Sequence, residues 1–141
     1  MSGWARDAVF YQIYALGFGG APEYNDFGAS APRLDKLYGW IGHLKDLGVT
    51  ALYLGPVFQS TRHGYDTADY YRIDSRLGDN EGFAKLCGAL HEAGIKVVLD
   101  GVFNHVGRDV WAFRDGRERG QGAPHRGWFD DLHLRRPPPS A

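Results

Sequence analysis

Three short apolar segments recur along the first hundred residues. Residues 9–14, 49–54 and 95–99 are rich in β-branched and aromatic side chains. Each run is four to six residues long and ends next to glycine, proline or aspartate, which is typical of β-strands. The last of them is almost continuously apolar, a pattern that indicates a strand covered on both faces.

Two amphipathic segments separate these strands. Apolar residues at three- and four-residue intervals predict a helix over residues 32–47, which Gly48 ends. The same spacing predicts a second helix that begins at a cap formed by Asp79 or Asn80 and ends at Gly94. The apolar positions of the two helices are Leu34, Leu37, Ile41, Leu44 and Leu47, and then Phe83, Leu86, Cys87, Leu90 and Ala93.

The remaining segments show no sustained period. A glycine-rich stretch at residues 17–22 predicts a long loop after the first strand. Residues 56–78 have no clear helical or strand pattern, and the chain after Asp100 is expected to be loop-like.

The order strand, helix, strand, helix, strand predicts an α/β fold with parallel strands. Such a chain can open either a doubly wound sheet or a TIM (β/α)₈ barrel. No glycine-rich phosphate-binding turn follows the first strand, and polar residues follow the second and third strands. The pattern therefore favours about three βα units, the N-terminal part of a TIM barrel.

Composition narrows the class of protein. With 141 residues, 43% of them apolar, and a net charge of −1, the chain predicts a globular domain rather than a disordered segment or a nucleic-acid binder. No apolar run approaches the ~20 residues of a membrane helix, and none follows Met1 as a signal peptide would, so a cytoplasmic location is expected. The single cysteine, Cys87, excludes an intrachain disulfide.

One polar cluster follows the second strand. His63, Tyr65, Asp66 and Asp69 share a glycine-containing loop. A tyrosine face covers the apolar side of a sugar ring, and a carboxylate accepts hydrogen bonds from its hydroxyl groups. Taken by itself, the cluster is more typical of a solvated turn whose aspartates cap the backbone, because short loops with tyrosine and aspartate are common.

A second cluster follows the third strand. Asp100, Asn104 and His105 lie within six residues, at the position where barrel enzymes carry substrate or metal contacts. Their spacing matches no common zinc pattern, and the oxygen of Asn104 suits calcium better. Each residue also has a structural interpretation, as a buried carboxylate or a hydrogen-bonded loop side chain.

Together the two clusters resemble the α-amylase family, glycoside hydrolase family 13. The resemblance is carried by the segments HGYDTADYYRID at residues 63–74 and DGVFNH at residues 100–105. Residues 8–14 and 48–58 resemble the first two barrel strands of that family. The form HGYDTADYY is most similar to the cyclomaltodextrinase, neopullulanase and maltogenic amylase types, which are intracellular.

The resemblance implies a role for each matching residue. Tyr65 matches the tyrosine that stacks on the sugar in the cleavage subsite, and Asp66 matches a carboxylate at the base of that pocket. His105 would bind the same sugar, and Asp100 would be the structural carboxylate that orients site residues. Asn104 matches a position at which some members bind calcium, the one cofactor that the resemblance suggests.

The resemblance also divides the chain. Residues 1–106 match the first three strands and two helices of the barrel, and residues 107–129 match the start of a small domain inserted after the third strand. Residues 130–141 form an arginine- and proline-rich tail unlike the family. The nucleophile and general acid of the family follow its fourth and fifth strands, so no catalytic residue is expected in this chain.

Two functions from different classes follow. The first is the N-terminal part of a retaining hydrolase of α-glucans such as maltooligosaccharides or cyclodextrins, inactive as this chain alone. The second is a non-catalytic carbohydrate-binding or scaffold protein that keeps half of a sugar site. A metal-dependent hydrolase using Asp66, Asp100 and His105 is a third and weaker hypothesis.

Overall fold

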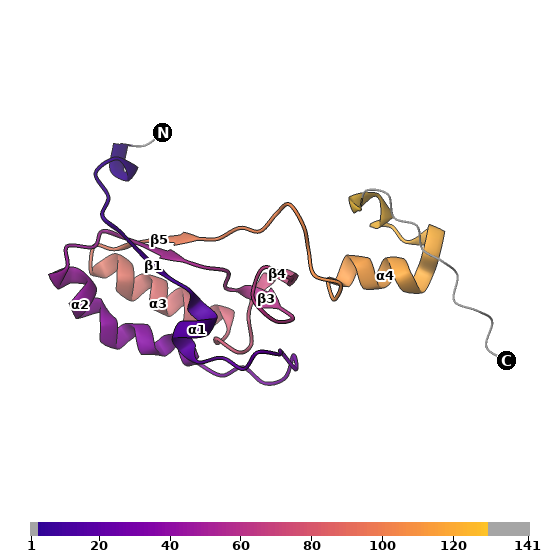
Figure 1. Ribbon diagram of the computed structural model, residues 1–141, viewed down its shortest axis with the longest axis horizontal. Helices are drawn as coiled ribbons and strands as arrows, with labels where there is room; N and C mark the ends of the chain where they lie inside the picture. Colours follow the sequence, from indigo (N-terminus) through magenta and orange to yellow (C-terminus); the bar gives the residue numbers. More distant parts are fainter. Residues whose placement is uncertain (1–2, 130–141) are drawn as a thin grey trace.

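A three-stranded parallel sheet forms the centre of the computed structural model, which describes residues 3–129 (Figure 1). The strands are β1 (Phe10–Ile13), β2 (Ala51–Leu54) and β5 (Lys96–Leu99). They lie in the order β1-β2-β5, with Tyr11 opposite Leu52 and Leu52 opposite Val97. The predicted α/β fold with parallel strands is confirmed.

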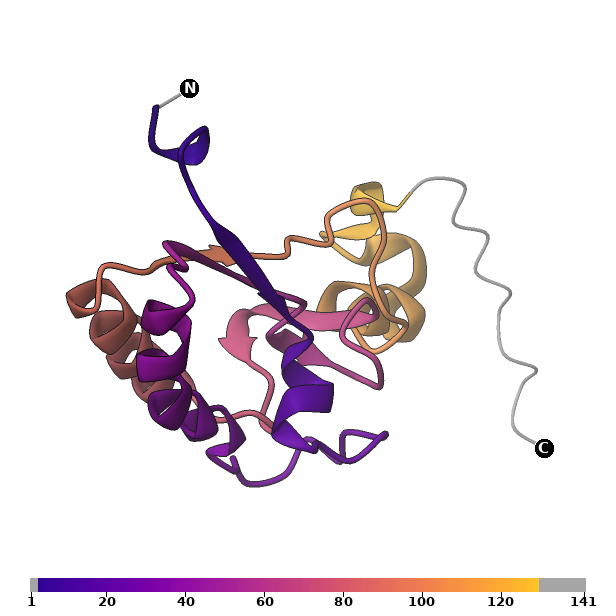
Figure 2. The ribbon, with the colours of Figure 1, turned by 60° about the vertical axis from the view of Figure 1, so that its left-hand side comes forward.

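Helices cover one face of this sheet (Figures 1 and 2). Helix α3 (Asn80–Glu92) follows the predicted pattern, and its cap is Asp79, whose carboxylate accepts a 2.8 Å hydrogen bond from the Gly82 N–H. Leu86 and Leu90 are almost fully buried in the core. Each such side chain contributes roughly 1.5–3 kcal/mol through the surface it removes from water.

The segment predicted as one helix over residues 32–47 is two elements. Residues Arg33–Trp40 form the 3-10 helix η2, and only Ile41–Asp46 form the α-helix α2. Leu34 and Leu37 are three residues apart, a spacing that also suits a 3-10 turn, so both are buried in either conformation. Gly48 ends the segment in the left-handed conformation, with φ 76°, as is common for the glycine that follows a helix.

Three other segments contain structure that the sequence analysis left as loops. A short helix, α1 (Ala15–Gly19), follows β1. Residues 56–78 contain an antiparallel hairpin of β3 (Phe58–Ser60) and β4 (Thr67–Ile73), whose register shifts twice. These shifts break the regular alternation that identifies a strand in a sequence.

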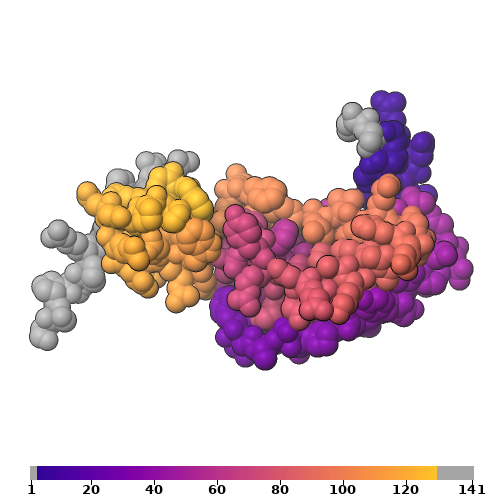
Figure 3. Space-filling model, turned by 180° about the vertical axis from the view of Figure 1, so that it is seen from behind, coloured from indigo at the N-terminus to yellow at the C-terminus, as the bar shows by residue number. Residues whose placement is uncertain are grey.

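The chain after Asp100 is not wholly loop-like. Helix α4 (Trp111–Arg119) and two 3-10 turns, η3 (Gly120–Gly122) and η4 (Arg126–Trp128), form a lobe at one end of the molecule (Figure 3). No side chain caps α4, and three of its nine residues are arginine, which explains why its pattern is weak. The remaining short element is the 3-10 turn η1 (Gly3–Ala5).

The boundary at residue 106 between barrel and inserted domain stays a prediction, and the predicted tail at 130–141 lies outside the described residues. Within residues 3–129, none of the helices combines the length and the apolar character that crossing a membrane requires.

Candidate functional site

The predicted site residues lie in two loops at the carboxyl ends of β2 and β5. Tyr65 and Asp66 belong to the β3–β4 loop, and Asp100 follows β5 directly. The backbone N–H of Asp100 donates a 3.1 Å hydrogen bond to the Leu54 carbonyl at the end of β2. Parallel pairing thus brings the start of the second polar cluster to the strand that leads into the first.

Two tyrosines, Tyr53 and Tyr65, interact with Asp100. Hydrogen bonding to the Asp100 carboxylate is the main reason why the pKa of Tyr53 is raised, and loss of hydration and the charge of Asp100 add to it. Loss of hydration raises the pKa of Tyr65, and the charge of Asp100 and its hydrogen bond add to this. Both phenols are therefore protonated donors at neutral pH.

Tyr53 was missed by the sequence analysis. It is the one partly exposed residue of β2, between the fully buried Leu52 and Leu54. Alternate strand residues point to opposite faces, so Tyr53 lies on the face away from the helices. The sequence feature that could have identified Tyr53 is its phenol group in the middle of an otherwise aliphatic strand.

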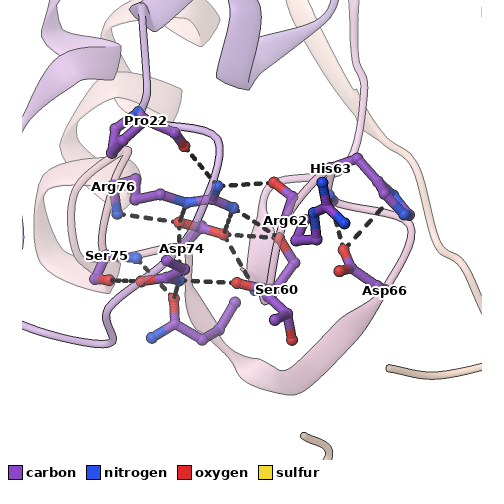
Figure 4. A network of polar contacts seen from close by, with 12 residues as sticks. Pro22, Ser60, Arg62, His63, Asp66, Asp74, Ser75 and Arg76 are labelled. Atoms are coloured by element: carbon purple, nitrogen blue, oxygen red, sulfur yellow. Dashed lines mark hydrogen bonds and ion pairs between the residues drawn. The ribbon is translucent and has the colours of Figure 1, made fainter. Parts of the chain in front are cut away.

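The loop around Tyr65 is held by its own side chains (Figure 4). The Gly64 N–H donates to Asp66 Oδ1 at 3.2 Å, and the Tyr65 N–H donates to His63 Nδ1 at 3.2 Å. His63 Nδ1 also lies 3.6 Å from Asp66 Oδ1. A nitrogen that accepts from Tyr65 carries no proton, so this geometry fits neutral His63 and not an ion pair with Asp66.

Tyr14 ties this loop to β1. Its hydroxyl donates a 3.0 Å hydrogen bond to the His63 carbonyl, 49 positions away. Tyr14 directly follows the end of β1, so the Tyr65 loop is held by a residue at the end of a neighbouring strand. The sequence analysis assigned Tyr14 no role.

Asn104 and His105 are placed differently. Both are exposed, and Tyr70 holds their segment by donating its hydroxyl to the Val102 carbonyl and, at 3.4 Å, to the His105 carbonyl. Across residues 3–129, the His105 side chain has no hydrogen bond or ion pair with the Tyr65 loop or Asp100. Tyr65 and Asp100 thus interact, while no hydrogen bond or ion pair joins the His105 side chain to either of them within residues 3–129.

The calcium site predicted at Asn104 stays a prediction. Asn104 is exposed, and the described part of the chain contains no group of three or more His, Cys, Asp and Glu side chains that could hold a metal ion. The trio proposed for a metal-dependent hydrolase, Asp66, Asp100 and His105, forms no such group either. We derive no chemical step through a metal.

Gly107 packs directly against the site loop. Its N–H donates to the Thr67 carbonyl at 2.8 Å, and a Cβ at this position would lie 2.4 Å from the backbone oxygen of Asp66. No real Cβ approaches a backbone oxygen so closely. The segment after β5 and the Asp66 loop therefore depend on glycine for their contact.

We expect Gly107→Ala to lower the free energy of unfolding by about 1–3 kcal/mol, because the added methyl group must push two backbone segments apart. Urea unfolding measures this loss. Gly101→Ala is the matched control, since its Cβ would meet only the ring of Phe103, which is 80% exposed and free to turn. Equal stability of the two variants would contradict the contact.

A buried ion pair between Arg76 and Asp74 lies next to the start of the Tyr65 loop (Figure 4). Arg76 and Asp74 are joined by a 2.8 Å contact and are both almost fully buried. Arg76 Nη1 donates to the carbonyl oxygens of Arg62, Pro22 and Glu23 at 2.7–3.0 Å. One guanidinium group thus fixes both the segment entering the site loop and the chain after α1.

Comparison with known proteins agrees with the geometry. The sequence-family model of the alpha-amylase catalytic domain matches residues 34–140. Neopullulanase 2 of Thermoactinomyces vulgaris is 40% identical over 142 residues, and a cyclomaltodextrinase of a Bacillus species is 37% identical over 147 residues. These matches cover 89% and 94% of this chain.

A solved structure is similar as well. The cyclic α-maltosyl-(1→6)-maltose hydrolase of Arthrobacter globiformis, in complex with that sugar, superposes with a TM-score of 0.74 and 34% identity, over 90% of this chain and 32% of the hydrolase. The chain spans about a quarter of the length of the curated relatives it matches, 24% and 26%. The structure accordingly covers part of a TIM barrel, as the sequence analysis predicted.

Proposed function

Because the chain belongs to the α-amylase family of glycoside hydrolases, we propose that it forms one wall of an α-glucan site. The observation that carries the proposal is the meeting of Tyr65 and Tyr53 at Asp100. It brings a side chain of the β3–β4 loop to the residue that follows β5, at the end of the sheet where barrel enzymes bind substrate.

In this proposal Tyr65 stacks on one glucose ring. The Tyr65 side chain is 41% exposed and interacts with Asp100, so part of the ring stays open to a ligand. Asp66 lines the base of the pocket, and His105 reaches the same sugar from the other loop. Because His105 is exposed and unrestrained by the two carboxylates, its approach accompanies substrate binding.

The whole protein, by the same proposal, hydrolyses maltooligosaccharides or cyclodextrins with retention of anomeric configuration. A retaining glycosidase needs a nucleophile and a general acid about 5 Å apart. The family resemblance places both after the fourth and fifth strands, and this chain would supply binding residues only. A cytoplasmic location is part of the proposal.

We expect the 141-residue chain to release no reducing sugar from maltotriose or β-cyclodextrin above the level of a Tyr65→Ala control. The reason is that binding without the acid and the nucleophile does not break a glycosidic bond. A reducing-end assay with hours of incubation measures this. Turnover that disappears in the Tyr65→Ala variant would show that this chain holds a catalytic pair, and would overturn the assignment of binding residues only.

The second hypothesis, a non-catalytic carbohydrate-binding protein, is supported by the same half-site. It differs from the first in one measurable respect, since a binding protein must retain maltooligosaccharides without the rest of a barrel. Calorimetric titration of this chain with maltotetraose, with Tyr65→Ala and His105→Ala as controls, separates the two. Binding that either variant weakens favours the second hypothesis.

A further inference from the structure

Two side chains from outside the Tyr65 loop hold the backbone that leads into Tyr65. Arg76 Nη1 donates a 2.7 Å hydrogen bond to the Arg62 carbonyl (Figure 4). The Tyr14 hydroxyl donates a 3.0 Å hydrogen bond to the carbonyl of the next residue, His63. Both side chains act on main-chain atoms two and three positions before Tyr65, so they limit the positions that the Tyr65 backbone can take.

The two side chains differ in what else depends on them. Arg76 is almost fully buried with Asp74, so its removal disturbs the core as well as the loop. Tyr14 is 45% exposed, and within residues 3–129 its hydroxyl makes one hydrogen bond, to the His63 carbonyl. Removing that hydroxyl leaves no buried charge without a partner. The contribution of Tyr14 to the loop can therefore be measured separately from the stability of the core.

Tyr14 itself is held in place on both sides. It lies between Ile13, the last residue of β1, and Ala15, the first residue of α1, and its carbonyl accepts a 2.9 Å hydrogen bond from the Phe18 N–H. Its ring packs against Gly17, where a Cβ would lie 2.9 Å from the ring atom Cδ1. A larger residue at that position would displace the ring. The Tyr14 hydroxyl is therefore a fixed donor at the junction of a strand and a helix.

We propose that Tyr14 is a positioning residue, whose hydroxyl keeps the Tyr65 loop in the conformation that binds sugar. The inference rests on the proposed function, in which Tyr65 stacks on a glucose ring, and adds a residue that acts through Tyr65. A loop that is ordered before the ligand arrives loses less conformational entropy on binding. Where the loop spends time in other conformations, the apparent affinity falls with the fraction that is competent to bind.

The first measurement is amide hydrogen exchange in the Tyr14→Phe variant of this chain, followed by NMR. The variant removes the hydroxyl and keeps the ring. The N–H groups of Gly64 and Tyr65, which are hydrogen-bonded within the loop, should exchange about three- to tenfold faster, because one hydrogen bond that favours the closed loop is lost. The amides of α3, which packs in the core, should be unaffected. Equal acceleration in α3 would mean that Tyr14 supports the whole fold, and would overturn the positioning role.

The second measurement is maltotetraose affinity in the whole protein, by calorimetric titration of wild type, Tyr14→Phe, Tyr65→Ala and the double variant. Tyr14→Phe should weaken binding about threefold, because a smaller fraction of the loop is competent to bind. The double variant should bind no more weakly than Tyr65→Ala alone, since without the Tyr65 ring there is no stacking surface left to position. Additive losses would mean that Tyr14 acts on the sugar independently of Tyr65, and would overturn the proposal.

The matched control is Tyr38→Phe, because Tyr38 is 41% exposed and lies on η2, outside the Tyr65 loop. It should change neither the exchange rates nor the affinity. If Tyr14→Phe also changes neither while Tyr65→Ala weakens binding, the positioning role is wrong and the proposed function stands. If the whole wild-type protein binds no maltotetraose, the proposed function fails, and the role of Tyr14 in sugar binding fails with it.

Discussion

Replacing Asp74 with alanine is expected to lower the free energy of unfolding by about 3–5 kcal/mol, a large part of the total stability of a small domain. The carboxylate accepts six hydrogen bonds, from Arg76, Ser60 and Asn25, at 2.8–3.3 Å. Without it, the positive charge of Arg76 stays buried with no counter-charge. Urea unfolding followed by circular dichroism measures the loss.

The matched control for this prediction is Asp69→Ala. Asp69 lies on β4, five residues before Asp74, and within residues 3–129 its carboxylate accepts a single hydrogen bond, 2.9 Å long, from the Tyr71 N–H. The Asp69→Ala substitution should lower the free energy of unfolding by about 0.5–1.5 kcal/mol. A loss for Asp74→Ala no larger than that of the control would contradict the central role of the buried pair.

A double variant separates charge from packing. Asp74→Leu combined with Arg76→Met removes both charges, so no unpaired ion stays in the core. We expect the double variant to be more stable than the sum of the two single losses would give. It should not reach wild-type stability, because the carbonyls of Pro22, Glu23 and Arg62 lose their donor. Simple additivity would mean that the two side chains act independently.

In the whole protein, replacing Tyr65 with alanine is expected to weaken maltooligosaccharide binding about 30-fold or more. Truncating an aromatic side chain at the centre of a binding site typically costs at least about 2 kcal/mol. Tyr65→Phe should lose less of the affinity for maltooligosaccharides, since the ring stays and only the interaction of the hydroxyl with Asp100 is removed. Calorimetric titration with maltotetraose measures both variants.

Tyr38→Ala is the control for exposure and composition. Tyr38 is 41% exposed, as Tyr65 is, and lies on η2, outside the Tyr65 loop and outside the segment that carries His105. Its replacement should leave binding unchanged. If both variants weaken binding equally, the ligand binds exposed aromatic side chains nonspecifically. If neither variant weakens binding, Tyr65 does not stack on the sugar.

Local patterns predicted the elements that form by local rules. The Asp79 cap and Gly94, with φ 79°, bound α3 as expected. The three parallel strands were readable because each is a short apolar run between turn residues. Helix η2 was misassigned as part of an α-helix because a spacing of three fits both helix types. The hairpin β3–β4 was missed because its irregular register removes the alternation.

The candidate site was predicted only in part. Tyr65 and Asp100 were named from their positions after two strands, and the structure joins them. Tyr53 was missed because its importance depends on the face of the sheet to which its side chain points. Tyr14 and Arg76 were missed because they act through backbone carbonyls, which every residue carries and no sequence motif marks.

The sequence by itself determined the order of the three parallel strands and of the two helical segments between them, the ends of α3 and the family signature, because these follow from neighbours a few positions apart. Only the tertiary structure decided which polar groups meet. Asn25 and Ser75 bond across 50 positions, and Tyr14 reaches His63 across 49. Contacts of this range form only after the sheet sets the register and the hydrophobic core brings distant loops to one edge.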